Sequence, residues 1–293
     1  MTDWGDEQDR GTTVSERLGF IGLGNMGAPM AAHLVGWPGG LTVFDARAEA
    51  MEPLVQAGAR AASSVRGVGE SVDIVSLVVM DDAQVVDVTH ELLEVAAAGT
   101  IVAIHSTIRP QTAERLAEEG AARGIHVVDA PVSGSTVGAH EGTLAVLVGG
   151  GDDAYRRCKE PFARMATLIT HFGPAGSATR AKIARNLINY VAFSAAGEAQ
   201  RIADAAGVDL RRLGRVVKHS DAVIGGPGNV FVREHAVPFG SDDPLRPFMA
   251  HAAVLGRKDL DLALELAGEL GVDVPLTALA RERLAGELGV PDA

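Results

Sequence analysis

The order of the secondary-structure signals constrains the fold of this chain more than any other feature. Short runs rich in β-branched residues occur in the first 175 residues, and helical patterns separate most of them: 18–21, 41–44, 74–79, 100–104, 125–128, 144–148 and 168–172. Strands that alternate with helices pair in parallel through βαβ crossovers. Several runs are apolar throughout, as expected when helices cover both faces of a sheet. An α/β, doubly wound and mostly parallel sheet is therefore predicted.

After about residue 175 the strand signals stop and only helical patterns follow: 178–206, 209–219, 245–270 and 275–287. Gly207 and Gly271 suit the position just past a helix, and Pro275 suits a first helical turn. The segment 219–244 is rich in Gly, Pro and charged residues and is interpreted as loops. We thus expect a flexible tail at 1–16, an α/β domain at 17–175, and an all-α domain at 176–293 that begins with a long interdomain helix.

The first predicted strand leads into a glycine-rich turn and a helix, LGFIGLGNMGAPMAAHL at 18–34. In Gly22-x-Gly24-x-x-Gly27, one glycine allows a tight turn, one allows pyrophosphate to approach, and one lets the helix pack on the strand. Asn25 and Met26 complete the turn, and the helix start offers N–H groups to an anion. The pattern predicts a dinucleotide-binding Rossmann domain over 17–175. The alternative is a glycine-rich turn in an ordinary α/β protein.

Asp45 ends the next predicted strand, 18 residues after Gly27. A carboxylate there can accept the ribose hydroxyls of the cofactor. It favours NAD, because a carboxylate repels the 2′-phosphate of NADP. Arg47 lies two residues further on and could pair with that phosphate, which would favour NADP; the other interpretation is a solvated charge.

The overall charge narrows the classes of partner. The formal net charge is −12, which argues against nucleic acid or an anionic membrane, since both attract clustered Lys and Arg. No run of 18 or more apolar residues exists, so no membrane span is expected. The polar opening MTDWGDEQDRGTTVSER has no hydrophobic stretch for a signal peptide. The expected partner is a small molecule.

Cysteine and histidine usage gives two further expectations. Cys158 is the only cysteine, which excludes disulfides within the chain and thiolate zinc sites and fits a reducing cytoplasm. Its place on a probable helix favours a buried, inert thiol. The histidines show no metal-ligand spacing, so no metal is expected.

A polar line marks the helix that opens the C-terminal region, GSATRAKIARNLINY at 176–190. Lys182, Asn186 and Asn189 recur at i, i+4 and i+7, on one helical face. A lysine within hydrogen-bond reach of a carbonyl oxygen can give and take a proton. The plain alternative is a lysine whose stem covers apolar surface while its head reaches water.

Five stretches together resemble the β-hydroxyacid dehydrogenase family, which includes 3-hydroxyisobutyrate dehydrogenase and tartronate semialdehyde reductase. They are GFIGLGNMGAPMAAHL, HSTIRP (105–110), DAPVSGSTVGAHEGTL (129–144), GPAGSATRAKIARNLIN (173–189) and GRKDLDLALELAGELGVDVPL (256–276). The resemblance covers nearly all of the chain after residue 17. It implies a Rossmann domain followed by a helical substrate and oligomerisation domain, with the active site in the cleft between them. It also implies reversible NAD(P)-dependent hydride transfer to or from a small carboxylic acid.

The resemblance implies a role for each matching residue. Lys182 would be the catalytic proton donor or acceptor, and Ser133, Gly134, Ser135 and Asn186 would bind the substrate. The cofactor would contact Gly22, Gly24, Asn25, Met26, Gly27, Asp45, Met80, Thr107 and Lys258. For Lys258 a plain alternative is a helix-start lysine beside Asp259 and Asp261. His219 and Asp221 could line the substrate side, although a solvated loop is the favoured interpretation.

The chain departs from the family pattern at several positions, which are His105, Asp81, Ser135 and Arg185. The family commonly has glycine at the place of Ser135 and an acidic residue at that of His105. It often has proline at the place of Asp81, and asparagine at that of Arg185. The C-terminus is also short. These changes weaken the assignment of any particular acid as substrate.

Other functions on the same scaffold remain open at this point. Imine reductases share the fold but generally have another residue at the place of Lys182. Chemistry of the 6-phosphogluconate type needs a phosphate-binding set that the sequence lacks. A catalytically silent dinucleotide-binding module is the alternative from another class. Ala-rich faces on 178–206 and 250–270 indicate buried helix contacts, and the resemblance implies a homodimer or homotetramer.

Overall fold

The computed structural model describes residues 15–230, 232–233 and 235–293. The chain divides into two compact units, one ending at Ala184 and the other covering Arg185–Ala293. The division falls inside helix α8 (Ser177–Ala205) rather than before it. Each unit is described separately below.

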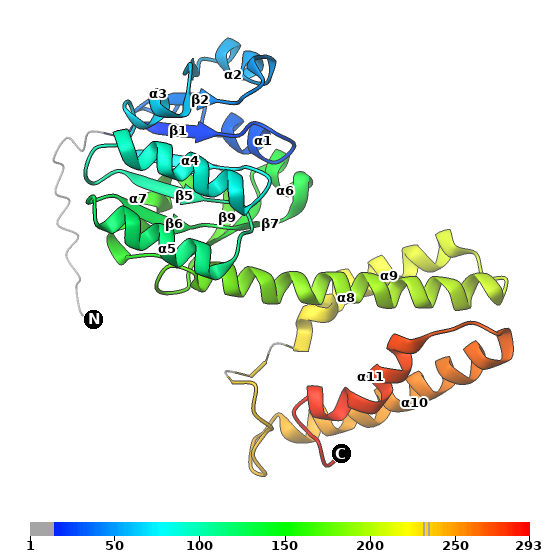
Figure 1. The fold of residues 1–293 in the computed structure, drawn as a ribbon. Helices are drawn as coiled ribbons and strands as arrows, with labels where there is room; N and C mark the ends of the chain where they lie inside the picture. The colour runs from blue at the N-terminus through cyan, green and yellow to red at the C-terminus, as the bar shows by residue number, and fades with distance from the viewer. Residues whose placement is uncertain (1–14, 231, 234) are drawn as a thin grey trace, which may run out of the picture. The chain divides into compact units, whose positions relative to one another are not determined.

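The first unit is built on a six-stranded sheet in the order β3-β2-β1-β4-β5-β6, with every neighbouring pair parallel. Its strands are β1 (Leu18–Ile21), β2 (Leu41–Phe44), β3 (Arg60–Ala61), β4 (Ile74–Leu77), β5 (Ile101–Ile104) and β6 (His126–Asp129). This strand order is that of a doubly wound, dinucleotide-binding sheet, so the predicted fold class is confirmed (Figure 1). The sequence did not indicate β3, because it has two residues and both are exposed.

A second sheet of three strands is connected to β6, an edge strand of the first sheet. It contains β7 (Val132–Ser133), β8 (Leu144–Val148) and β9 (Ala166–His171), with β8 antiparallel to β7 and parallel to β9. An isolated antiparallel bridge between Asp129 and Gly149 connects the two sheets.

Helices cover both faces of the large sheet, as its apolar strands require. The helices of the first unit that precede α8 are α1 (Gly27–Ala32), α2 (Glu52–Gln56), α3 (Val65–Gly69), α4 (Asp82–Val95), α5 (Pro110–Ala121), α6 (Ser135–Glu141) and α7 (Asp152–Phe162), with a 3₁₀ turn, η1, at Ala48–Ala50. Val68, Leu92 and Leu116 pack α3, α4 and α5 on one face. Met30 and Phe162 pack α1 and α7 on the other. Figure 1 shows α4 and α5 crossing in front of the sheet.

Glu16 corrects part of the prediction for the N-terminus. We expected residues 1–16 to form a tail with no part in the fold, and residues 1–14 lie outside the described part of the chain. The Glu16 carboxylate, however, accepts hydrogen bonds from Arg157 at 2.6 and 3.0 Å, and its carbonyl accepts one from the Trp37 indole at 2.7 Å. Glu16 therefore belongs to the folded unit.

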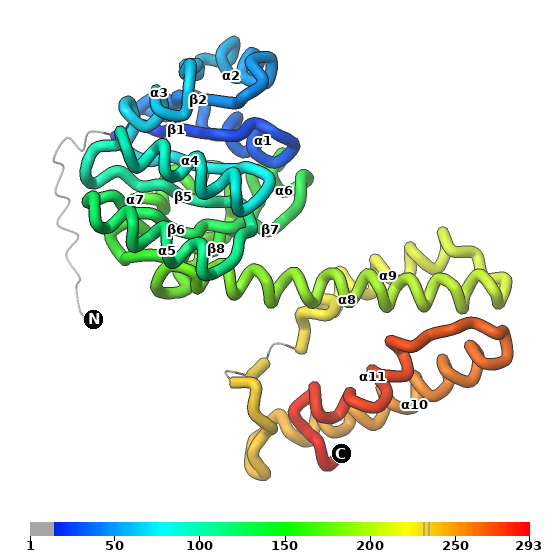
Figure 2. The backbone as a smooth tube through the Cα atoms, in the orientation of Figure 1, coloured from blue at the N-terminus to red at the C-terminus, as the bar shows by residue number. Residues whose placement is uncertain are grey.

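The second unit is helical. After the end of α8 it contains α9 (Leu210–Ile224), a 3₁₀ turn η2 (Gly226–Val230), α10 (Arg246–Leu270) and α11 (Pro275–Glu287). The predicted loop at 219–244 is wrong at its start, because α9 continues to Ile224 and ends on Gly225, whose φ is +86°. His219 and Asp221 are thus exposed helix residues, not loop residues. Figure 2 shows α10 and α11 side by side.

The helical unit buries few large side chains in the described part of the chain. Its core cluster consists of Met249, Ala253, Ala285 and Val290, and α9 has no buried residue. A capping interaction also holds it together: the Glu198 carboxylate accepts hydrogen bonds from the N–H groups of Leu276 and Thr277, each at 2.9 Å. The first turn of α11 is therefore fixed to α8.

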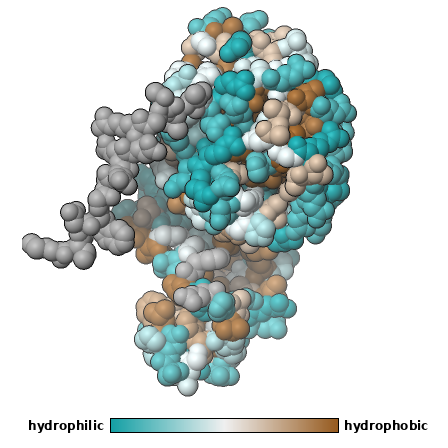
Figure 3. All heavy atoms as spheres, turned by 90° about the vertical axis from the view of Figure 1, so that its left-hand side faces the viewer, coloured by the Kyte–Doolittle hydropathy of each residue, from teal (hydrophilic) through white to brown (hydrophobic). Residues whose placement is uncertain are grey.

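The surface carries both charged and large apolar side chains. On the face drawn in Figure 3, hydrophilic side chains dominate and hydrophobic ones are scattered between them. Among the residues that the structure describes, no helix is long and apolar enough to cross a membrane.

Candidate active site

The glycine-rich turn between β1 and α1 has the shape that pyrophosphate binding requires. Gly22 has φ +91°, and a Cβ there would lie 1.9 Å from the Val78 carbonyl oxygen. A Cβ on Gly27 would lie 1.9 Å from the Gly22 carbonyl oxygen, so only glycine lets α1 approach the strand this closely. Gly24 faces open space with no atom within 4 Å of a Cβ position. The turn therefore fits the diphosphate of a dinucleotide.

Asp45 follows β2 and is tied to the glycine-rich turn. Its Oδ2 accepts a hydrogen bond from the Leu23 N–H at 2.7 Å, and its Oδ1 accepts from the N–H and Nε of Arg47 at 2.9 and 3.2 Å. Burial raises the pKa of this carboxyl, but these hydrogen bonds outweigh it and hold the pKa below its usual value. Asp45 is therefore an ionised acceptor at neutral pH, and Arg47 is its ion-pair partner.

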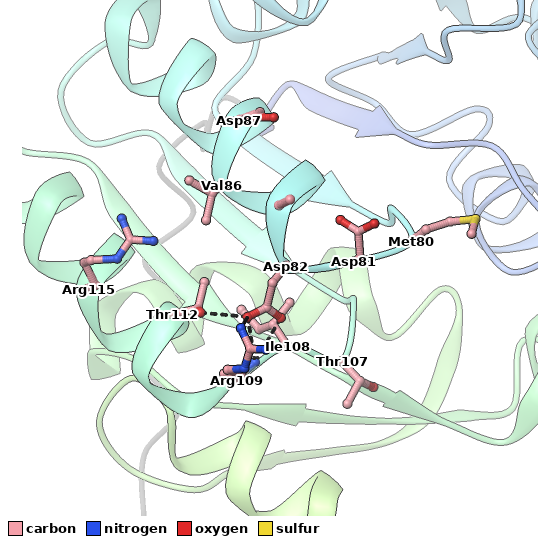
Figure 4. A pocket seen from close by; sticks show the side chains of 11 residues that line it. Met80, Asp81, Asp82, Val86, Asp87, Thr107, Ile108, Arg109, Thr112 and Arg115 are labelled. Atoms are coloured by element: carbon pink, nitrogen blue, oxygen red, sulfur yellow. Dashed lines mark hydrogen bonds and ion pairs between the residues drawn. The ribbon is translucent and has the colours of Figure 1, made fainter.

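Met80 and Thr107 come together at the carboxyl edge of the sheet. Ser106 joins the ends of β4 and β5, because its Oγ accepts from the Val79 N–H at 2.9 Å and donates to the Val79 carbonyl at 2.7 Å. Met80 and Thr107, the residues that follow, are both exposed and line one pocket of about 830 Å³. Its other side is a cluster in which Asp82 accepts hydrogen bonds from Arg109 and Thr112 (Figure 4).

The loop after β6 contains the predicted carboxylate-binding residues. Ser133 ends β7 opposite Ala145, and Gly134 has φ +135°. Ser135 has φ +56°, in the left-handed region that favours glycine. Glycine, which the resemblance implies at this position, would adopt such a φ freely, whereas Ser135 keeps its hydroxyl at the expense of backbone strain.

Two of the remaining departures from the family pattern have structural explanations. Asp81 caps α4, since its Oδ1 accepts from the Gln84 N–H at 2.9 Å. His105 is buried and bridges Ala130 and Ser76: Nδ1 lies 2.7 Å from the Ala130 carbonyl oxygen and Nε2 lies 3.1 Å from the Ser76 Oγ. The ring therefore supports the start of the carboxylate loop from inside the core.

Lys182 lies in the second turn of α8 and is buried, with 7% of its surface exposed. Asn186 and Asn189 lie on the same face of that helix and are half-buried. Asn186 accepts a hydrogen bond from Arg185 at 3.5 Å. The predicted polar line therefore exists, and its lysine is its most buried member.

The predicted site residues divide between the two units. The glycine-rich turn, Asp45, Met80, Thr107, the loop at 133–135 and Lys182 all belong to the first unit, whereas Asn186 and Lys258 belong to the second. Lys258 lies in the middle of α10, not at a helix start, and its Nζ is 3.2 Å from Asp259 Oδ1.

Sequence reasoning missed one residue that organises this region. Asp129, the last residue of β6, is 1% exposed and accepts hydrogen bonds from two N–H groups at the start of α8. Its place at the head of DAPVSG was the only available signal, because partners about 50 positions away leave no local pattern.

Cys158 needs no functional role: burial raises the pKa of its thiol to about 12. In the described ranges, no group of three His, Cys, Asp or Glu residues could hold a metal ion.

Comparison with known protein families matches both units. Residues 17–173 match the NAD binding domain of 6-phosphogluconate dehydrogenase. Residues 176–287 match the family described as NAD-binding of NADP-dependent 3-hydroxyisobutyrate dehydrogenase. Together these matches follow the order of the two units along the chain.

Individual proteins extend the comparison. An uncharacterized oxidoreductase of Mycobacterium tuberculosis is 55% identical over 278 residues, which cover 94% of each chain. The NAD-dependent L-serine dehydrogenase of Pseudomonas aeruginosa is 35% identical over 278 residues, covering 90% of each. A crystal structure of a Mycobacterium avium oxidoreductase has a TM-score of 0.91 and 49% identity, covering 94% of this chain and all of that one. The resemblance inferred from the sequence is thus confirmed: the chain belongs to the β-hydroxyacid dehydrogenase family of NAD(P)-dependent oxidoreductases.

Proposed function

We propose that this protein transfers a hydride reversibly between a nicotinamide cofactor and the hydroxyl carbon of a small 3-hydroxy acid or its semialdehyde, with Lys182 as the general acid and base. The observation that carries the proposal is the burial of Lys182, which is only 7% exposed. A lysine whose stem merely covered apolar surface would extend its ammonium group into water. A buried lysine in the unit that also contains the glycine-rich turn and the loop at 133–135 is suited to proton transfer at a bound substrate.

The cofactor-binding part of the proposal rests on the glycine-rich turn and Asp45. NAD or NADP supplies or accepts the hydride when bound. The N–H groups of the turn hold its diphosphate and Asp45 accepts its ribose hydroxyls. The residues assigned to the cofactor are Gly22, Gly24, Asn25, Met26, Gly27 and Asp45 at the nucleotide, with Met80, Thr107 and Lys258 toward the nicotinamide.

The substrate-binding part of the proposal assigns one task to each polar group. The Ser133 hydroxyl and the N–H groups of Gly134 and Ser135 bind the carboxylate of the acid. Asn186 donates a hydrogen bond to the oxygen of the reacting carbon without adding charge. In oxidation Lys182 Nζ takes the hydroxyl proton as the C–H hydride leaves; in reduction it returns that proton to the carbonyl oxygen.

NAD is the proposed cofactor in preference to NADP. The ionised Asp45 repels a 2′-phosphate, and Arg47, the nearest cation along the chain, is already paired with Asp45 at 3.2 Å. Both observations support the preference for an unphosphorylated ribose. Equal kcat/KM values with the two cofactors would contradict it.

The proposed assembly is a homo-oligomer, a dimer or a tetramer, in the cytoplasm. Large apolar side chains are exposed on the helices of the second unit, including Phe193, Val216, Val223 and Phe248. Such faces mark surfaces that associate. A solution mass of two or four times the 30.3 kDa chain is expected, and a monomer at micromolar concentration would contradict the proposal. The buried thiol of Cys158, the only cysteine, supports a reducing compartment.

Initial rates with a panel of acids test the proposed reaction. The panel contains 3-hydroxyisobutyrate, D-glycerate, 3-hydroxypropionate and L-serine, each with NAD and with NADP, alongside a calorimetric titration of the cofactor. Oxidation of at least one acid is expected. Tight cofactor binding without oxidation of any acid would identify a silent binding module. Reduction of a cyclic imine that is unchanged in Lys182→Ala would identify an imine reductase.

A further inference from the structure

Asp129 is fixed by its backbone at the junction of the two sheets. It ends β6 in register with Ile104 of β5. Its N–H donates to the Gly149 carbonyl at 3.1 Å, and its own carbonyl accepts from the Gly149 N–H at 2.8 Å. The residue is 1% exposed. Its Cα is thus held from two sides, directly before the loop that carries Ser133.

The side chain of Asp129 reaches a different element, the start of α8. Its Oδ1 accepts a hydrogen bond from the Gly176 N–H at 2.8 Å, and its Oδ2 accepts one from the Thr179 N–H at 2.7 Å. The first N–H groups of a helix lack partners within the helix, and a carboxylate there also interacts favourably with the helix dipole. A residue 47 and 50 positions earlier in the chain therefore caps the longest helix of the described structure.

Gly149 leaves the room that this interaction needs. A Cβ on Gly149 would lie 2.3 Å from the Asp129 Oδ1 and 3.1 Å from the Ala178 N. Any side chain would displace either the carboxylate or the first turn of α8. The small residue is thus part of the same arrangement as the acid.

Asp129 connects the segment that binds the substrate carboxylate to the segment that transfers the proton. Ser133 lies four residues after Asp129, and Lys182 lies three residues, about one helical turn, after Thr179. We propose that Asp129 is a positioning residue that sets the Lys182 amine relative to the carboxylate-binding loop. The inference rests on the proposed role of Lys182 in proton transfer. In this role Asp129 touches neither substrate nor cofactor and acts only through α8.

The substitution Asp129→Asn keeps the shape of the side chain and removes one acceptor. Its amide oxygen can accept from only one of the two N–H groups, and its NH₂ group opposes the other. The backbone bonds to Gly149 remain, so the carboxylate loop keeps its place while the start of α8 shifts. With the acid of the panel that the wild-type enzyme oxidises fastest, kcat should fall about 10- to 100-fold, as expected for a misplacement of about 1 Å. The KM of the acid and the calorimetric Kd of NAD should stay within about twofold.

A double-mutant cycle separates positioning from general damage. If Asp129 acts through Lys182, Asp129→Asn should lower kcat in the wild-type background and leave the residual kcat of Lys182→Ala within about twofold. An equal fall in both backgrounds would overturn the inference while leaving the proposed role of Lys182 intact. Unchanged kcat in Lys182→Ala alone would instead overturn the proposed function.

A control and a second variant complete the test. Glu114→Gln removes the exposed ion pair between Glu114 Oε1 and Arg180 Nη2, at 2.7 Å, which joins the same turn of α8 to α5. It should leave kcat within about twofold, because exposed pairs contribute little. Gly149→Ala keeps the carboxylate but displaces it or the start of α8, so it should lower kcat as much as Asp129→Asn does. If Asp129→Asn does not fold, Gly149→Ala tests the positioning role in its place. Wild-type kcat in a folded Gly149→Ala would overturn the inference.

Discussion

Acidification should destabilise the first unit through His105, and the size of the effect follows from its surroundings. The ring is 3% exposed and lies between two aromatic rings, with centroids 6.5 Å from Phe20 and 5.2 Å from Phe162. Burial lowers its pKa from 6.5 to about 4, against a smaller opposite effect of the hydrogen bond to Ala130. The folded protein therefore keeps His105 neutral at a pH where the unfolded chain has already protonated it.

The sign and magnitude follow from proton linkage. Because the folded pKa is the lower one, unfolding takes up a proton between pH 6.5 and about 4, and stability falls as the pH falls through this window. A pKa shift of this size changes the free energy of unfolding by about 3.4 kcal/mol in total. About 2.5 kcal/mol of this stabilisation is lost when the pH falls to about 4.5. This loss is a large fraction of the stability of a typical domain.

Urea unfolding at a pH of about 7.5 and about 4.5 measures the effect. Trp37 is buried in the first unit and reports its unfolding by fluorescence; a Trp4→Phe background removes the other tryptophan of the chain. His105→Asn keeps a donor for the Ala130 carbonyl and does not titrate. The stability loss between the two pH values should be about 2.5 kcal/mol smaller in His105→Asn than in its parent. Equal losses in the two proteins would show that His105 does not cause the pH dependence.

Single contacts at Asp45, Glu198 and Ser135 each have a measurable effect. Asp45→Ala should weaken NAD binding about 10- to 100-fold in a calorimetric titration, because hydrogen bonds to a charged acceptor contribute about 1.5–3 kcal/mol; an unchanged Kd would contradict the assignment. Glu198→Gln should destabilise the protein in urea by about 1 kcal/mol, the usual effect of losing a helix cap, and no change would show that the cap at Leu276 and Thr277 is unimportant. Ser135→Gly should raise stability by about 0.5–1 kcal/mol, because the left-handed strain that it removes, about 1–2 kcal/mol, exceeds the entropic cost of a glycine, about 0.5–1 kcal/mol; a loss of stability would argue against that strain.

Local patterns in the sequence predicted most of the fold. Strands β1, β2 and β8 and helix α11 have the predicted bounds, because each is a run of apolar or helix-forming residues with clear ends. The glycine-rich turn was predictable too, because its three glycines lie within six residues between a strand and a helix. The C-terminal end of α9 was not predictable, because the polar segment around His219 resembles a loop. Only the structure shows that the helix continues to Ile224 and is capped by Gly225.

The candidate site was harder to predict from the sequence than the fold, because the contacts that organise it join residues far apart in the chain. Spacing placed Lys182 and Asn186 on one helical face but could not show that Lys182 is buried. Asp129 and Gly176 are 47 positions apart, and nothing in either local pattern indicates that one caps the other. His105 appeared only as a departure from a family pattern, whereas it bridges Ser76 and Ala130 in the core.

The turnover of Lys182→Ala measures whether Lys182 transfers the proton of the reaction. Reduced nicotinamide is measured with the acid that the wild-type enzyme oxidises fastest, with acid and cofactor both saturating, and calorimetry confirms that the variant still binds NAD. A fall in kcat of about 10²- to 10⁴-fold with retained NAD binding is predicted, the usual contribution of a general acid–base group. A kcat within about twofold of the wild-type value would exclude Lys182 as the general acid and base.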